Sequence, residues 1–146
     1  SKNWLIIQIL IWLPIVFPFV FYFLPRIADA NASVIIVSII IGVVIGITEE
    51  ILWRGVYIRK FPSSKFRGII YPAIWFSIWH IAPQSVLPNQ MPGGIAPFLF
   101  YALVLGLDWG LVTWRTDSIR WVVVVHCIHD TLGLSGFTFL QSNRTF

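Results

Sequence analysis

The sequence predicts an all-α fold, a polytopic transmembrane bundle of about five spanning helices. Of the 146 residues, 58% are hydrophobic and only 11% are charged, whereas soluble domains carry about 25% charged residues. The apolar residues also form long runs, and a spanning helix needs roughly 20 mostly apolar residues. We therefore expect an integral, multi-pass membrane protein.

The apolar runs give the predicted helices in order. The first, residues 4–24, contains Pro14 and Pro18, which are expected to bend it. The remaining four runs cover residues 33–57, 68–81, 95–114 and 119–134, and the last can continue to residue 140. Residues 83–94 contain Pro and Gly and no charge, so an irregular turn outside the helices is expected there.

Basic residues predict the orientation of these helices. Four of them, Arg59, Lys60, Lys65 and Arg67, lie in the loop between the second and third helices. The positive-inside rule places this loop, and with it the N-terminus, in the cytoplasm. In this setting the net charge of +4 indicates topology and contact with anionic membrane lipids. It does not indicate nucleic-acid binding.

Ionisable residues interrupt three of the apolar runs. They are Glu49, Glu50 and Arg54 in the second, His80 in the third, and His126, His129 and Asp130 in the fifth. Such residues are costly inside a bilayer and are functional candidates by default. Counted from basic residues at the helix ends, Glu49 and Asp130 lie roughly 15 Å deep, His80 roughly 20 Å and His126 roughly 9 Å. These overlapping depths predict one shared site.

Helical spacing indicates how these side chains pair. Glu50 and Arg54 are four residues apart and can form an ion pair, which serves either helix packing or the site. Glu49 is rotated by about 100° from Glu50 and must find another partner, such as an imidazole, or hold a proton. Either state suits a general base.

The two histidine-containing segments show similar local relations. Phe76 is four residues before His80, so its ring is expected to support the imidazole. His126, His129 and Asp130 share one side of the fifth helix. A carboxylate beside imidazoles can fix their tautomers or supply a metal ligand.

These residues form an ordered set of motifs: EExxxR at residues 49–54, FxxxH at 76–80 and HxxxN/D at 126–130. The set resembles the CAAX-protease and bacteriocin-processing (CPBP, or Abi) family, which includes the Ras-converting endopeptidases. The resemblance implies an intramembrane glutamic protease without a cofactor, in which Glu49 and His80 activate water. His126 and Asp130 would stabilise the oxyanion, supported by Glu50, Arg54, Phe76 and His129.

The resemblance also implies an organisation and a setting. We expect an N-terminal helix and loop at residues 1–32, a catalytic helical core at 33–140 and a tail at 141–146. The partners would be a peptide or membrane-protein substrate and membrane lipids, in a prokaryotic cell membrane. About five helices are fewer than the prenyl-protein proteases have, so a lipid-tail groove is expected to be incomplete and a substrate other than a prenylated protein is favoured.

One departure from the motif leaves a role open. Asp130 stands where the prenyl-protein proteases have Asn, and an ionised Asp would repel an oxyanion. Asp130 is therefore either a protonated donor or an anion that orients His126 or His129.

Two alternative functions also remain. Glu49, His80, His126 and Asp130 could form a zinc site of a membrane metalloprotease, although HExxH is missing. The chain could also be a non-catalytic immunity or scaffold protein of the membrane.

Overall fold

A computed structural model describes the backbone of residues 2–29, 31–86, 91 and 93–142. Within these residues the regular structure is helical and no strand occurs. Three helical stretches of this part of the chain are long and apolar enough to cross a membrane, namely Trp4–Phe23, Ala32–Lys60 and Ile95–Thr116. The predicted all-α membrane fold is confirmed.

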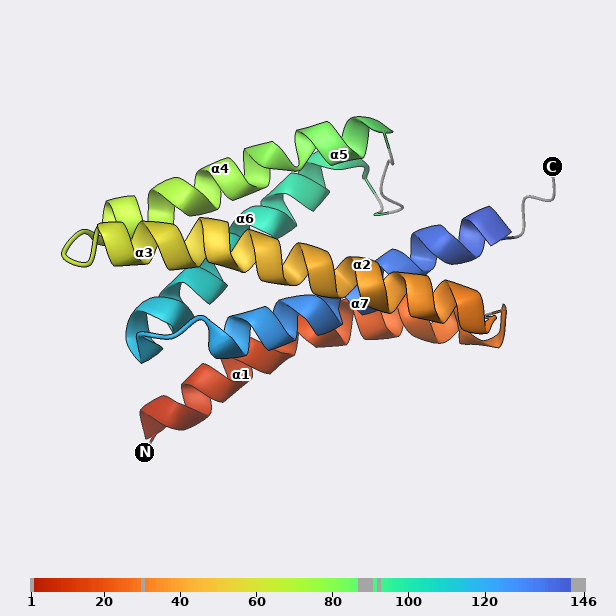
Figure 1. Cartoon of the computed structure of the whole chain (residues 1–146), viewed down its shortest axis with the longest axis horizontal. Helices are drawn as coiled ribbons and strands as arrows, with labels where there is room; N and C mark the ends of the chain where they lie inside the picture. The colour runs from red at the N-terminus through yellow and green to blue at the C-terminus, as the bar shows by residue number, and fades with distance from the viewer. Residues whose placement is uncertain (1, 30, 87–90, 92, 143–146) are drawn as a thin grey trace. The chain divides into compact units, whose positions relative to one another are not determined.

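The helices follow the predicted order (Figure 1). The first predicted helix comprises α1 (Lys2–Pro18), the π-helix η1 (Phe19–Phe23) and the 3-10 helix η2 (Leu24–Asp29). The second comprises α2 (Ala32–Glu50), the π-helix η3 (Ile51–Val56) and α3 (Tyr57–Lys60), and the third comprises the π-helix η4 (Phe66–Ile70) and α4 (Tyr71–Trp79). After the short α5 (Ile81–Val86), α6 (Ile95–Thr116) and α7 (Arg120–Ser142) complete the chain.

The irregular turn expected at residues 83–94 is wrong in its first part. α5 extends to Val86, and the amide of Gln84 donates to the carbonyl of His80 at 3.1 Å. Pro83 does not prevent this helix, because it lies in the first turn, where a missing N–H leaves no helical bond unmade. Residues 87–90 and 92, and residues 143–146 of the predicted tail, lie outside the described residues.

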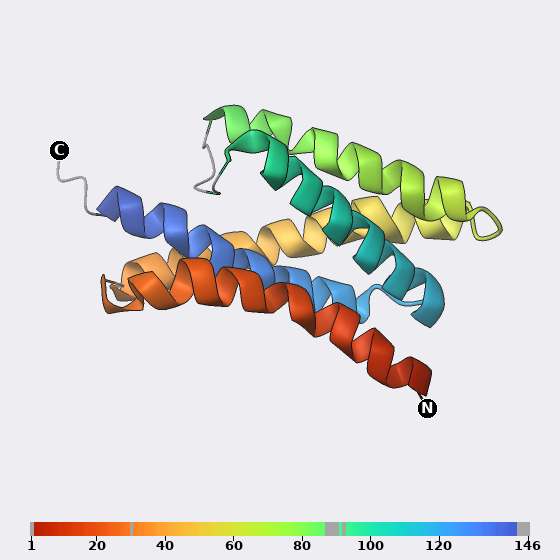
Figure 2. The ribbon, with the colours of Figure 1, turned by 180° about the vertical axis from the view of Figure 1, so that it is seen from behind.

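The chain divides into two compact units. The first contains residues 1–49 and 120–146, in which α7 packs against α1, η1 and η2. Pro18 immediately precedes η1, and the α1–η1 stretch curves along its length (Figure 2), as the two prolines predict. Asn31 caps the start of α2, because its Oδ1 accepts a hydrogen bond from the amide of Val34 at 2.9 Å.

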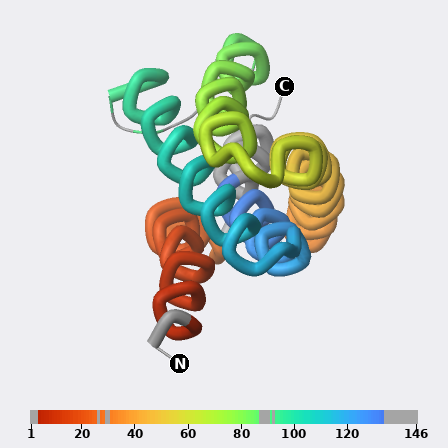
Figure 3. Tube along the Cα trace, turned by 90° about the vertical axis from the view of Figure 1, so that its left-hand side faces the viewer, coloured from red at the N-terminus to blue at the C-terminus, as the bar shows by residue number. Residues whose placement is uncertain are grey.

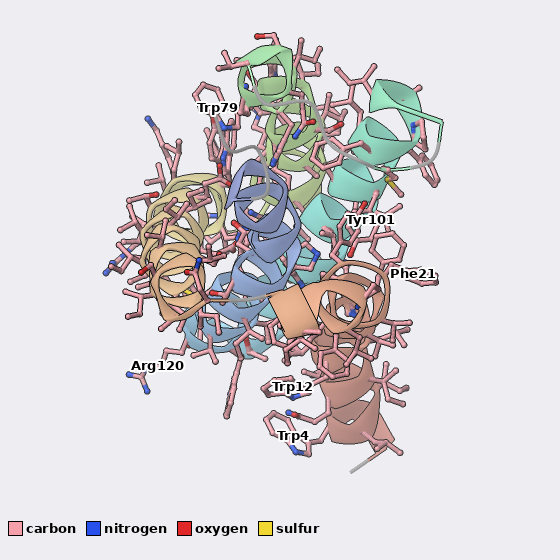
Figure 4. All side chains as sticks on the ribbon, turned by 90° about the vertical axis from the view of Figure 1, so that its right-hand side faces the viewer. Trp4, Trp12, Phe21, Trp79, Tyr101 and Arg120 are labelled. Atoms are coloured by element: carbon pink, nitrogen blue, oxygen red, sulfur yellow. The ribbon has the colours of Figure 1, made fainter. Side chains whose placement is uncertain are left out.

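The surface of the first unit is apolar, as a lipid environment requires. Ile36, Ile40 and Val44 form a stripe at four-residue spacing on α2, and each is more than half exposed. Trp4 and Trp12 project from α1 and are 49% and 40% exposed (Figure 4). Such a surface would be unfavourable in water but suits contact with acyl chains and headgroups.

The second unit contains residues 50–119. After α3 the chain reverses, and η4 returns beside α3 (Figures 1 and 3). The Oγ of Ser64 accepts a hydrogen bond from the amide of Arg67 at 3.3 Å, which helps to start η4. α4 and α6 pack closely at Gly106, which has no side chain. A Cβ added there would lie 3.0 Å from the Cβ of Ala73. α6 ends at Thr116, and the next residue, Asp117, caps it with a left-handed φ of 50°.

Candidate active site

Two glycines of α2 set the spacing of the helices that carry the first group of candidate residues. A Cβ at Gly46 would lie 2.7 Å from the amide nitrogen of Cys127, and one at Gly42 would lie 2.6 Å from Oγ1 of Thr131. Only glycine permits so close an approach between α2 and α7 in this unit. Gly42 and Gly46 form a GxxxG motif, which is typical of tightly packed membrane helices.

This close approach brings together the acidic and imidazole side chains of the first unit, which we call the carboxylate–imidazole cluster: Glu49, His126, His129 and Asp130. Oε2 of Glu49 lies 3.8 Å from Nε2 of His126. His126 is 3% exposed. The predicted imidazole partner of Glu49 is therefore present, at the distance of a charge contact and not of a short hydrogen bond.

Asp130 lies between two imidazoles. Its Oδ1 is 3.2 Å from Nδ1 of His129, and its Oδ2 is 3.4 Å from Nε2 of His126. Each carboxylate oxygen thus faces a ring nitrogen, which is the arrangement of an acceptor that orients imidazoles. These contacts agree with one of the two expected roles of Asp130, that of an anion that orients the imidazoles.

The second unit holds what we call the Arg54 cluster: Glu50, Arg54, Phe76 and Trp109. Nη1 of Arg54 donates to Oε1 of Glu50 at 2.8 Å, and the two side chains are 2% and 0% exposed. The predicted ion pair is confirmed. The guanidinium carbon lies 4.4 Å from the ring centre of Phe76 and 5.6 Å from that of Trp109. Aromatic faces stabilise a cation that is withdrawn from water.

His80 lies at the C-terminal end of α4, and its tautomer follows from one contact. Nδ1 of His80 is 2.7 Å from the carbonyl oxygen of Phe76. A carbonyl oxygen only accepts, so Nδ1 must carry the proton and donate. In the neutral ring, Nε2 then keeps its lone pair and can act as a base.

Aromatic rings hold the imidazole of His80 in place. The ring centre of Phe76 lies 4.7 Å from that of His80, as predicted from the four-residue spacing, and the ring centre of Phe98 lies 5.6 Å from it. The backbone behind the imidazole is also fixed, because Oγ of Ser77 donates to the carbonyl of Leu99 at 2.7 Å. His80 is only half-buried, so Nε2 is not sealed off by its neighbours.

Sequence reasoning missed several contributors to these clusters. Trp109 and Phe98 carried no motif, whereas Gly42 and Gly46 carried a visible GxxxG signal. Asp108, an acid within α6, was also missed. Among the described residues, the carboxylate of Asp108 makes no hydrogen bond or ion pair.

The proposed zinc set finds no support in this arrangement. In the described part of the chain, no group of three or more His, Cys, Asp or Glu side chains could hold a metal ion. This negative result covers Glu49, His126 and Asp130, which lie close together but do not form such a group.

Comparison with known proteins gave one match. A family model described as type II CAAX prenyl endopeptidase, Rce1-like, matches residues 31–132. No curated protein and no solved structure matched the chain. The matched stretch includes all the residues of both clusters.

Proposed function

Because the chain belongs to the Rce1-like type II CAAX prenyl endopeptidase family, a family of intramembrane endopeptidases, we propose that it hydrolyses a peptide bond with a water activated by Glu49 and His80. The substrate would be a peptide segment held at the membrane. The observation that carries the proposal is the carboxylate of Glu49 facing the imidazole of His126 at 3.8 Å within an apolar helix pair.

The resemblance to the family supports the following roles, and the contacts of each side chain agree with them. Glu49 takes a proton from water, and the resulting hydroxide attacks the carbonyl carbon of the scissile bond. Nε2 of His80 accepts a hydrogen bond from the same water, which orients it. The tetrahedral oxyanion accepts a hydrogen bond from His126. The C–N bond then breaks as the proton held by Glu49 passes to the leaving amine.

The remaining polar residues support these steps. Asp130 orients the imidazoles of His126 and His129, with which it is in contact. Glu50 balances the charge of Arg54, so that this buried cation is paired within its own unit. The protein thereby keeps one carboxylate for structure and one for proton transfer.

The test is cleavage of a synthetic peptide ending in a Cys-aliphatic-aliphatic-X sequence, prepared with and without a prenyl group. Glu49→Gln should reduce kcat by about 10²-fold to 10⁴-fold, the usual cost of losing a general base. Asp117→Asn makes the same chemical change in an exposed turn with left-handed φ. Asn adopts that conformation readily, so this control should keep its activity.

Two further measurements make the proposal refutable. If Glu49 and His80 act on one water, the double variant Glu49→Gln/His80→Phe should lose little more activity than either single variant. Multiplicative losses would refute the shared water. Elemental analysis of the purified protein addresses the zinc alternative: one zinc per chain, with activity lost on chelation and restored on return of the metal, would replace this mechanism.

A non-catalytic immunity or scaffold function predicts a different result. In that case the purified protein cleaves neither peptide, and Glu49→Gln changes nothing. Cleavage of the prenylated peptide alone would identify the lipid as part of the substrate.

A further inference from the structure

A pocket of about 550 Å³ lies in the second unit, where α3 ends and η4 begins. Its size is within the range of small-molecule sites in proteins. Leu52 and Val56 contribute apolar walls, and Tyr57 and Tyr71 contribute phenol rings. None of these residues has a role in the proposed reaction.

Two cations stand at this pocket. Lys60 and Arg67 both line it and both are exposed. The guanidinium carbon of Arg67 lies 5.6 Å from the ring centre of Phe61, another lining residue, which restrains the side chain. No acidic residue lines the pocket, so its polar end is positively charged.

The aromatic rings of the wall form a continuous series of ring–ring contacts. The ring of Tyr57 lies 6.3 Å from that of Trp53 and 5.9 Å from that of Tyr71. Tyr71 in turn contacts Trp75, at 6.2 Å between ring centres. Tyr and Trp are the residues that membrane proteins concentrate at headgroup level.

The length of the spanning helix places the pocket at that level. The apolar stretch Ala32–Lys60 has 29 residues, which corresponds to about 43 Å of helix. The hydrocarbon core of a bilayer is only about 30 Å thick. The helix is therefore longer than the hydrocarbon core, and its charged end at Lys60 is the end expected in the headgroup region, with Leu52 and Val56 one to two turns deeper.

We propose that this pocket binds an anionic phospholipid. Its phosphate would contact Lys60 and Arg67, and the upper part of one acyl chain would lie against Leu52, Val56 and Phe66. The exposed cations and the absence of acids around the pocket favour an anionic over a zwitterionic headgroup. The apolar wall favours a lipid over a soluble phosphate.

The test is native mass spectrometry of the purified protein in detergent with added phosphatidylglycerol or phosphatidylcholine. Lys60→Gln/Arg67→Gln should weaken phosphatidylglycerol binding at least about tenfold, the factor lost with one charge-assisted hydrogen bond. Arg59→Gln/Lys65→Gln is the matched control. It removes the same charge from exposed residues of the same region that do not line the pocket, and it should retain binding.

A third variant tests the apolar part without altering charge. Val56→Trp fills the wall beside Tyr57 and should also weaken phosphatidylglycerol binding, because the acyl chain is displaced. Equal losses in the two double variants would overturn the proposal in favour of general charge attraction. Equal binding of phosphatidylcholine, or displacement of phosphatidylglycerol by millimolar inorganic phosphate, would also overturn it.

Discussion

The ion pair of Glu50 and Arg54 predicts a large stability effect of one substitution, Glu50→Gln. The two side chains are 0% and 2% exposed, and their charged atoms are 2.8 Å apart. At an effective dielectric constant of about 20, this distance corresponds to an attraction of about 6 kcal/mol. The amide of Gln still accepts a hydrogen bond from Arg54, so part of the interaction survives. We therefore expect a loss of about 3–5 kcal/mol, the usual result of leaving one buried charge unpaired.

The measurement is equilibrium unfolding of the purified protein in mixed micelles with a rising fraction of sodium dodecyl sulfate, followed by tryptophan fluorescence. Glu49→Gln is the matched control, since it makes the same change at the neighbouring residue and keeps the Glu50–Arg54 ion pair. A loss of about 3–5 kcal/mol is a large part of the 5–15 kcal/mol that stabilises a typical domain. Folded yield should therefore fall for the Glu50 variant and much less for the Glu49 variant.

A compensating variant separates charge from packing. In Glu50→Gln/Arg54→Met the buried cation is gone, and Met can occupy the space between Phe76 and Trp109. Replacing a buried ion pair by well-packed apolar groups is often neutral. The buried amide of the introduced Gln still costs less than an unpaired charge, so stability should recover in part. The reasoning is refuted if Glu50→Gln destabilises no more than Glu49→Gln, or if the double variant is less stable than the single one.

Three further predictions concern helix packing, topology and Asp130. Gly46→Ala should lower activity, because the added Cβ would lie 2.7 Å from the backbone of α7 and force Glu49 away from its imidazole, whereas Gly55→Ala, with contacts of 3.7 Å, should be tolerated. Equal activity of the two variants would contradict this role of the glycine. In a cysteine-free background, a cysteine at Ser85 should be labelled in intact cells and one at Ser64 only after permeabilisation; the opposite pattern inverts the orientation. Asp130→Asn should lower kcat at every pH tested, since the amide cannot accept from two imidazoles at 3.2 and 3.4 Å as a carboxylate does. Activity that persists and extends to higher pH would instead identify a protonated donor.

Contacts within one helix were predictable from the sequence. The four-residue spacing was enough to pair Glu50 with Arg54 and to place the ring of Phe76 beside His80. The same spacing also puts the carbonyl of Phe76 within reach of Nδ1 of His80. These relations depend only on helical geometry, which apolar runs of this length specify well.

Contacts between helices were less predictable. They depend on how each helix is rotated about its own axis and on how far apart neighbouring helices lie. Helical rise predicted that Glu49 and the histidines of α7 lie at overlapping depths, but not that Glu49 would face His126. Trp109 could not be assigned to Arg54, since a tryptophan in an apolar run gives no sign of its partner. The GxxxG motif of α2 was readable from the sequence and would have predicted which face of α2 meets a neighbouring helix.

The two adjacent acids of α2 show how environment separates structure from chemistry. Glu50 faces a guanidinium that carries its charge at every relevant pH, and the pair is enclosed by aromatic rings. Taking up a proton at Glu50 would leave that cation unbalanced, so this carboxylate is unsuited to be a base. Glu49 is rotated toward an imidazole, a group that gains and loses protons near neutral pH. A proton arriving at Glu49 can therefore be balanced by a change at His126, and this difference supports the proposal that the first acid of the motif carries out proton transfer.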